Sequence, residues 1–90
     1  MFIALKKEYF EAFARREKRE EFRLYGPRWN ERVCVEGRAV TLSCGYSGPR
    51  LNGVIAGFRT IPARDVPGIR AVYPEVKSRD LVAAIAIDLT

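Results

Sequence analysis

Hydrophobic and polar residues follow two different periods in the first 25 positions. A short apolar run at residues 2–5 predicts a strand, and apolar residues at helical spacing predict an amphipathic helix over residues 7–17. Residues 20–25 alternate with a period of two, which predicts a strand with one buried face and one face available for chemistry. The core is expected to hold the aromatic residues of the helix, Tyr9, Phe10 and Phe13.

The rest of the chain predicts three longer strands. Alternation indicates strands at residues 38–46 and 51–61, and Gly53 and Gly57 inside the second of them indicate a bulge or a close approach of another backbone. Residues 81–89 are almost continuously apolar and include β-branched side chains. This composition favours a strand that is buried on both faces.

Two segments predict less regular structure. Residues 26–32 form a turn-rich loop that carries the only tryptophan, Trp29. Prolines and a glycine break up the chain after residue 61, which leaves room for a helical turn at residues 63–66 and a short strand at residues 69–73.

This order of elements predicts a small α+β protein. Strand, helix and three strands, followed by irregular structure and a final strand, indicate a compact barrel with one or two short helices packed at its ends. Ninety residues supply one modest core, so we expect a single domain over residues 1–90.

Composition narrows the chemistry. Arginine supplies most of the 16 positive charges, and the net charge of +5 permits attraction to phosphate. The chain has no histidine, and its two cysteines, Cys34 and Cys44, are expected as buried free thiols. We therefore expect no metal, no cofactor and no Ser-His or Cys-His catalysis.

No apolar run approaches the roughly 20 residues of a membrane span, and the N-terminus lacks signal-peptide features. These two observations predict a cytoplasmic protein without a membrane partner.

Charged residues gather where the predicted helix gives way to the strand at residues 20–25. Side chains two apart on a strand share a face and are separated by roughly 7 Å, so Glu21 and Arg23 can meet. Lys18 lies at the turn that leads into this strand and can reach the same end. The alternative is an ordinary surface ion-pair cluster, worth under about 1 kcal/mol.

The spacing of these residues resembles the ASCH domain. That family has a lysine at the end of the first strand, a short helix, and then the pattern G-x-K-x-x-E-x-R. Here the matching residues are Lys6, Lys18, Glu21 and Arg23, and Arg16 stands where the family usually has glycine. Glycine tolerates a positive φ, so the turn after the helix must form without it. The resemblance implies a PUA-like β-barrel of five to six strands with one or two short helices at its ends.

The resemblance also implies a cleft between the first helix and the barrel that receives RNA, a nucleotide or a nucleoside. The candidate binding residues are Lys6, Lys18, Glu21, Arg23, Tyr25, Arg28, Trp29 and Ser43. Basic side chains would contact phosphates or base edges. Trp29 would stack on a base, or would instead plug one end of the barrel.

A small hydrolase is the alternative function. Lys18, assisted by Glu21, would act on RNA as a ribonuclease or on a modified nucleoside. One ASCH branch, the N4-acetylcytidine amidohydrolases, uses a lysine, a threonine three residues later and a distant glutamate. Glu21 occupies the threonine position in this chain, so that nucleophile is missing. We therefore favour an RNA- or nucleotide-binding module, and the sequence leaves open whether the protein is an enzyme.

Overall fold

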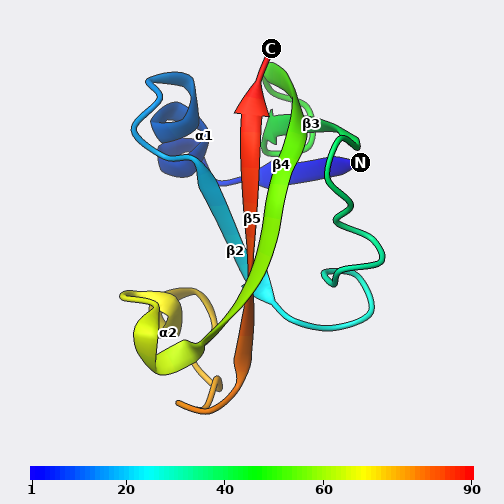
Figure 1. Cartoon of the computed structure of the whole chain (residues 1–90). Coiled ribbons are helices and arrows are strands. Elements are labelled where there is room, and N and C mark those ends of the chain that lie inside the picture. Colours follow the sequence, from blue (N-terminus) through cyan, green and yellow to red (C-terminus); the bar gives the residue numbers. More distant parts are fainter.

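One five-stranded sheet organises the chain, with a short helix near each end of it (Figure 1). The computed structural model describes residues 1–90. The elements in chain order are β1 (Phe2–Leu5), α1 (Lys7–Ala14), β2 (Glu20–Leu24), β3 (Ala39–Cys44), β4 (Arg50–Pro62), the 3-10 helix η1 (Ala63–Asp65), α2 (Ile69–Val72) and β5 (Leu81–Leu89). Neither α-helix is long and apolar enough to cross a membrane. The α+β class, the first predicted helix and the five strands predicted before and after the irregular segment are confirmed.

The last strand lies inside the sheet. The strand order is β1-β3-β4-β5-β2, in which β1 pairs with β3 in parallel and the other pairs are antiparallel. Side chains from Val82 to Ile85 are fully buried. The prediction of a final strand covered on both faces is therefore confirmed.

The sheet is not a closed barrel, because its edge strands β1 and β2 do not pair. A side chain links these two edges. Nη2 of Arg23 on β2 donates a hydrogen bond of 2.9 Å to the carbonyl oxygen of Ala4 on β1. The structure therefore confirms a small α+β fold with a five-stranded sheet and short helices, but it does not confirm the expected barrel.

Both glycines of β4 have the roles that the sequence predicts. The register between β4 and β5 shifts between Ile55 and Gly57, which is a β-bulge. A Cβ atom on Gly53 would collide with the carbonyl oxygen of Asp88 on β5. The long strand pairs with β3 over residues 50–54 and with β5 over residues 53–62.

The strand predicted at residues 69–73 is wrong, because this segment contains α2. Gly68 has a φ of +79°, which turns the chain directly before the helix. The run over residues 69–72 is too short for its hydrophobic period to distinguish a helix from a strand, so tertiary packing decides between them. Ile69 is buried in a small cluster with Ala63, Val66, Val76 and Val82.

A larger apolar cluster fills the space between α1 and the sheet. It contains Phe10 and Phe13 from α1, together with Ile85 and Ile87 from β5. The predicted place of these two aromatic residues in the core is confirmed. Because Val82 faces the opposite side of β5, this strand separates the larger cluster from the one beneath α2.

An ion pair between β2 and β4 makes a pH-dependent contribution to stability. Arg59 donates hydrogen bonds of 3.0 and 2.9 Å to Glu20, which hold the pKa of this carboxyl below its ordinary 4.5. A lowered folded-state pKa stabilises the protein above the unfolded value and loses that effect as the pH falls through the folded value. We expect the difference in unfolding midpoint between wild type and Arg59→Ala to be measurable at neutral pH. Denaturant titrations should show this difference shrink as the pH falls below 4.5 through the lowered pKa of Glu20, and a constant difference would contradict the assignment.

Candidate functional site

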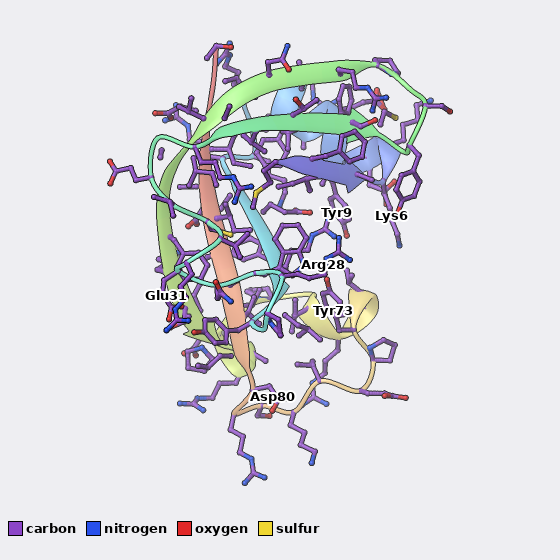
Figure 2. The ribbon with its side chains drawn as sticks, turned by 90° about the vertical axis from the view of Figure 1, so that its right-hand side faces the viewer. Lys6, Tyr9, Arg28, Glu31, Tyr73 and Asp80 are labelled. Carbon is purple, nitrogen blue, oxygen red and sulfur yellow. The ribbon has the colours of Figure 1, made fainter.

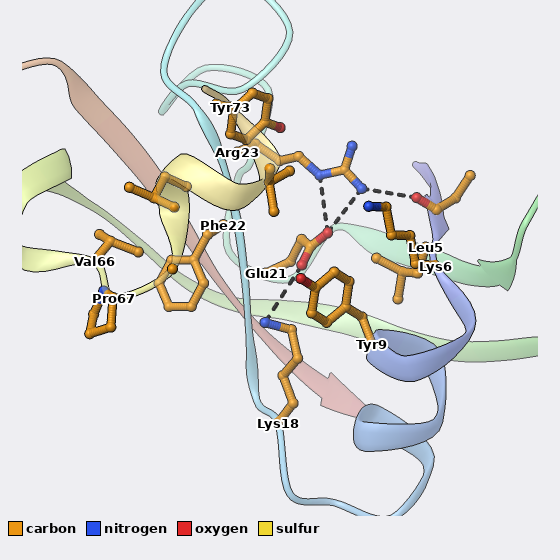
Figure 3. A pocket seen from close by; sticks show the side chains of 14 residues that line it. Leu5, Lys6, Tyr9, Lys18, Glu21, Phe22, Arg23, Val66, Pro67 and Tyr73 are labelled. Atoms are coloured by element: carbon orange, nitrogen blue, oxygen red, sulfur yellow. Dashed lines mark hydrogen bonds and ion pairs between the residues drawn. The ribbon is translucent and has the colours of Figure 1, made fainter. Parts of the chain in front are cut away.

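A pocket of about 340 Å³ lies between the start of α1, strand β2 and α2 (Figure 3). It brings together four of the predicted binding residues, Lys6, Lys18, Glu21 and Arg23. A hollow therefore lies beside the first helix in this fold. Its opposite wall is α2, which the sequence did not indicate.

Glu21 is the centre of the polar side of the pocket. Its Oε2 accepts hydrogen bonds from Nε and Nη2 of Arg23 at 3.1 and 2.9 Å, and its Oε1 is 3.7 Å from Nζ of Lys18. The side chain of Glu21 is 8% exposed, whereas those of Lys18 and Arg23 are 19% and 22% exposed. The contact predicted from the strand spacing is confirmed, and its burial distinguishes it from an ordinary surface cluster.

Aromatic rings surround the ammonium group of Lys18. Nζ is 4.8 Å from the ring centroid of Phe22, 5.5 Å from that of Tyr9 and 5.6 Å from that of Phe13. Cation–π attraction to these rings helps to hold the ammonium group at this position. Lys18 is therefore a positioned cation at the wall of the pocket.

The turn after α1 delivers Lys18 to this place. The N–H of Arg16 bonds to the carbonyl of Phe13, and the N–H of Glu17 bonds to the carbonyl of Ala12, both at 2.9 Å. This is the Schellman arrangement that closes a helix end. Its central residue needs a positive φ, and Arg16 adopts one of +63° although it is not glycine. Lys18 also bonds through its own N–H to Ala12, so the backbone that carries the ammonium group is fixed.

Arg16→Gly is expected to stabilise the protein by about 0.5–1 kcal/mol. A left-handed conformation costs a non-glycine residue about 1–2 kcal/mol, and the greater freedom of glycine in the unfolded chain offsets part of this gain. Thermal unfolding would show a midpoint several degrees higher. Arg79→Gly is the matched control, since Arg79 is exposed and has no positive φ. A loss of stability in Arg16→Gly would contradict the strain at this turn.

Apolar side chains line the remainder of the pocket. It is lined by Leu5 from β1, Tyr9 from α1 and Phe22 from β2, and from the α2 region by Val66, Pro67, Ile69, Val72 and Tyr73. The helical spacing predicts Tyr9 in the core with its neighbours, yet Tyr9 is only partly buried and faces the pocket. The α2 wall carried no motif, and the one available signal was the Pro67-Gly68 pair that precedes it.

Arg28 and Trp29 lie beside the pocket. The guanidinium carbon of Arg23 is 5.0 Å from the ring centroid of Trp29, and that of Arg28 is 5.7 Å from it. Trp29 is half-buried and packs against the larger core cluster, which agrees better with the expected plug than with an open stacking platform. In the view of Figure 2, Arg28 lies between Tyr9 and Tyr73.

Tyr25 and Ser43 do not line the pocket. The hydroxyl of Tyr25 donates a hydrogen bond of 2.6 Å to Glu31, which raises the pKa of Tyr25 and lowers that of Glu31. Ser43 is fully buried, and its hydroxyl accepts a hydrogen bond from Arg50. The alternation of β3 placed Ser43 opposite the core-facing residues but gave no sign that this second face is also covered.

The charges of the pocket do not cancel. Lys6, Lys18 and Arg23 contribute three positive charges, and Glu21 contributes the only negative one. Lys6 makes no ion pair, since the salt bridges of the pocket join only the other three residues. The net charge of +2 beside apolar and aromatic walls favours a ligand that combines an anionic group with a flat ring.

The residues present give little support to metal or nucleophilic chemistry. No group of three or more histidine, cysteine, aspartate or glutamate side chains is positioned to hold a metal ion. The lining contains no serine, threonine, cysteine or aspartate. Both cysteines are free thiols, of which Cys34 is buried and Cys44 partly so, and burial raises the pKa of the Cys34 thiol.

No model of a protein family matches this chain, and a search of curated proteins finds no match. The geometry of the pocket therefore carries the functional argument.

Proposed function

We propose that this protein is an ASCH-like module of the PUA-like group that binds RNA or a nucleotide in the pocket between α1, β2 and α2. One observation carries the proposal. The Lys18, Glu21 and Arg23 cluster stands at the wall of an apolar pocket with a net positive charge. The same residues also resemble the ASCH pattern, which agrees with the proposal.

The anionic part of the ligand is expected to meet donors that the protein leaves free. Arg23 uses Nε and Nη2 for contacts within the protein, and its Nη1 has no protein partner. Lys6 is exposed and unpaired at the start of α1. Charged donors of this kind form the stronger class of hydrogen bonds to phosphate oxygens.

The size and the walls of the pocket favour a single base over a duplex. Ligand pockets span roughly 300–1,000 Å³, so a hollow of about 340 Å³ is at the small end of this range. Tyr9, Phe22 and Tyr73 offer aromatic surface for a base taken out of its stack. Single-stranded RNA or a free nucleotide meets this requirement, and double-stranded RNA does not.

Binding is better supported than hydrolysis. Both carboxylate oxygens of Glu21 already have cationic partners, so Glu21 is not free to act as a base. The pocket also lacks the serine or threonine hydroxyl that an activated nucleophile requires. Cleavage of RNA by Lys18 remains the second candidate only through the resemblance, and the experiment below includes it.

The test is a titration of the protein with a labelled single-stranded RNA pool at about 50 and about 200 mM salt, with recovery of the RNA to check its length. Wild type is compared with Lys6→Ala and with Lys77→Ala, a matched pair of exposed lysines of which only Lys6 lines the pocket. We expect salt-dependent binding, about threefold to tenfold weaker in Lys6→Ala and unchanged in Lys77→Ala. The emission of Trp29, the only tryptophan, should respond because its ring stacks on Arg23.

Three results would count against the proposal. Absence of binding at both salt concentrations would exclude RNA as the ligand. Equal losses in the two lysine variants would indicate general attraction to a basic protein and not a site. Shortened RNA after incubation with wild type would favour the ribonuclease over the binding module.

A further inference from the structure

A second hollow of about 310 Å³ lies at the other end of α1. Its walls come from the turn after α1 and from the end of β5. Arg16, Lys18 and Arg19 contribute three positive charges, and Asp88 contributes one negative charge. Lys18 also lines the first pocket, so this residue borders both hollows.

The guanidinium groups of the two arginines in this hollow have no hydrogen-bond or ion-pair partner in the protein. Arg15 and Arg59 elsewhere on the surface each pair with a glutamate, whereas the side chains of Arg16 and Arg19 make no ion pair or hydrogen bond. The backbone beneath them is held. The carbonyl of Arg19 accepts a hydrogen bond of 2.9 Å from the N–H of Ile87, and the Schellman bonds fix Arg16.

The backbone conformation of Arg16 also favours a role for this residue in ligand binding. The turn needs a positive φ, for which glycine is the ordinary residue, and an arginine costs stability there. Backbone strain of this kind is found mainly at functional positions. The cost is offset if the guanidinium group binds a ligand.

We infer that the second hollow is a phosphate subsite, so that the ligand is a single-stranded oligonucleotide that extends from the first pocket past Lys18 to Arg16 and Arg19. The inference rests on the proposed function and specifies its substrate class. A hollow with net charge +2 and without aromatic walls other than Phe13 suits a phosphate and not a second base. A free mononucleotide would fill the first pocket alone.

The experiment compares a nucleoside 5′-monophosphate with single-stranded RNA oligonucleotides of two to six residues, by calorimetry or competition. Wild type should bind the longer ligands at least tenfold more tightly than the monophosphate. Arg16→Gly and Arg19→Ala should each weaken oligonucleotide binding about threefold to tenfold and lower the salt slope by about 0.7, as expected for one lost phosphate contact to a single strand. Both variants should bind the monophosphate as wild type does.

Arg16→Gly makes this test independent of folding, because the substitution relieves strain and is expected to raise the melting temperature. Arg79→Ala, at an exposed arginine outside both hollows, controls for the loss of one positive charge. Equal affinity of wild type for the monophosphate and the oligonucleotides, or unchanged oligonucleotide binding in both variants, would overturn the subsite and leave the proposed function intact. Failure of wild type to bind either ligand would overturn both.

Discussion

Glu21→Ala is expected to destabilise the protein by about 2–3 kcal/mol. Removing one partner of a buried ion pair costs about 3–5 kcal/mol because the remaining charge stays buried without compensation. The cost here is lower, since Lys18 and Arg23 each retain about a fifth of their exposure. Arg23 would lose both of its bonds to Glu21 while it still bridges to Ala4 on the opposite edge of the sheet.

Thermal unfolding would measure this effect as a midpoint about 10–20 °C lower, at 4–8 °C per kcal/mol for a domain of this size. Glu17→Ala is the matched control, since Glu17 pairs with Arg15 in a contact whose two side chains are each 58% exposed. Glu21→Gln keeps an acceptor for Arg23 and should lie between the two. If Glu21→Ala were no more destabilising than Glu17→Ala, the cluster would be an ordinary surface ion pair after all.

The polar half of the candidate site could be predicted because it depends on local geometry. Residues two apart on a strand share a face, so Glu21 and Arg23 could meet wherever the strand lay. The turn after the helix places Lys18 at the same end of the strand, and the missing glycine at Arg16 marked where that turn would be strained. These relations span fewer than ten residues and need no knowledge of the tertiary fold.

The apolar half could not be predicted because it depends on packing between distant segments. Tyr9 belongs to the same helical stripe as Phe10 and Phe13, and only the position of α2 leaves it facing a pocket. The run from Ile69 to Val72 is too short for its period to separate helix from strand. Likewise, closure of the sheet depends on the distance between β1 and β2, which no local pattern encodes.

In the cluster of Lys18, Glu21 and Arg23, Glu21 is therefore expected to serve mainly stability and Lys18 mainly ligand binding. Glu21 is the most buried member and holds both cations, so its removal should affect folding first. Lys18 is held by three rings as well as by Glu21 and lines both hollows. A substitution that removes only the charge of Lys18 should lower the affinity for the ligand more than it lowers stability.

Lys18→Met is accordingly expected to weaken RNA binding about 10- to 100-fold while it changes stability by less than about 1 kcal/mol. A hydrogen bond to a charged group contributes about 1.5–3 kcal/mol, which corresponds to this range. Methionine keeps the length of the side chain, and its thioether packs well against the rings of Tyr9, Phe13 and Phe22. Glu21 retains Arg23 as its partner, so no buried charge is left alone.

Titration with the labelled RNA pool and thermal unfolding, both on the same preparation, would separate the two effects. Lys77→Met removes an equal charge outside the pocket and should leave both measurements unchanged. Binding lost at an unchanged melting temperature would identify Lys18 as a ligand contact. A melting temperature lowered by 10 °C or more would instead make Lys18 a structural member of the cluster, because at about 4–8 °C per kcal/mol such a shift exceeds the expected change. Unchanged binding would remove Lys18 from the site altogether.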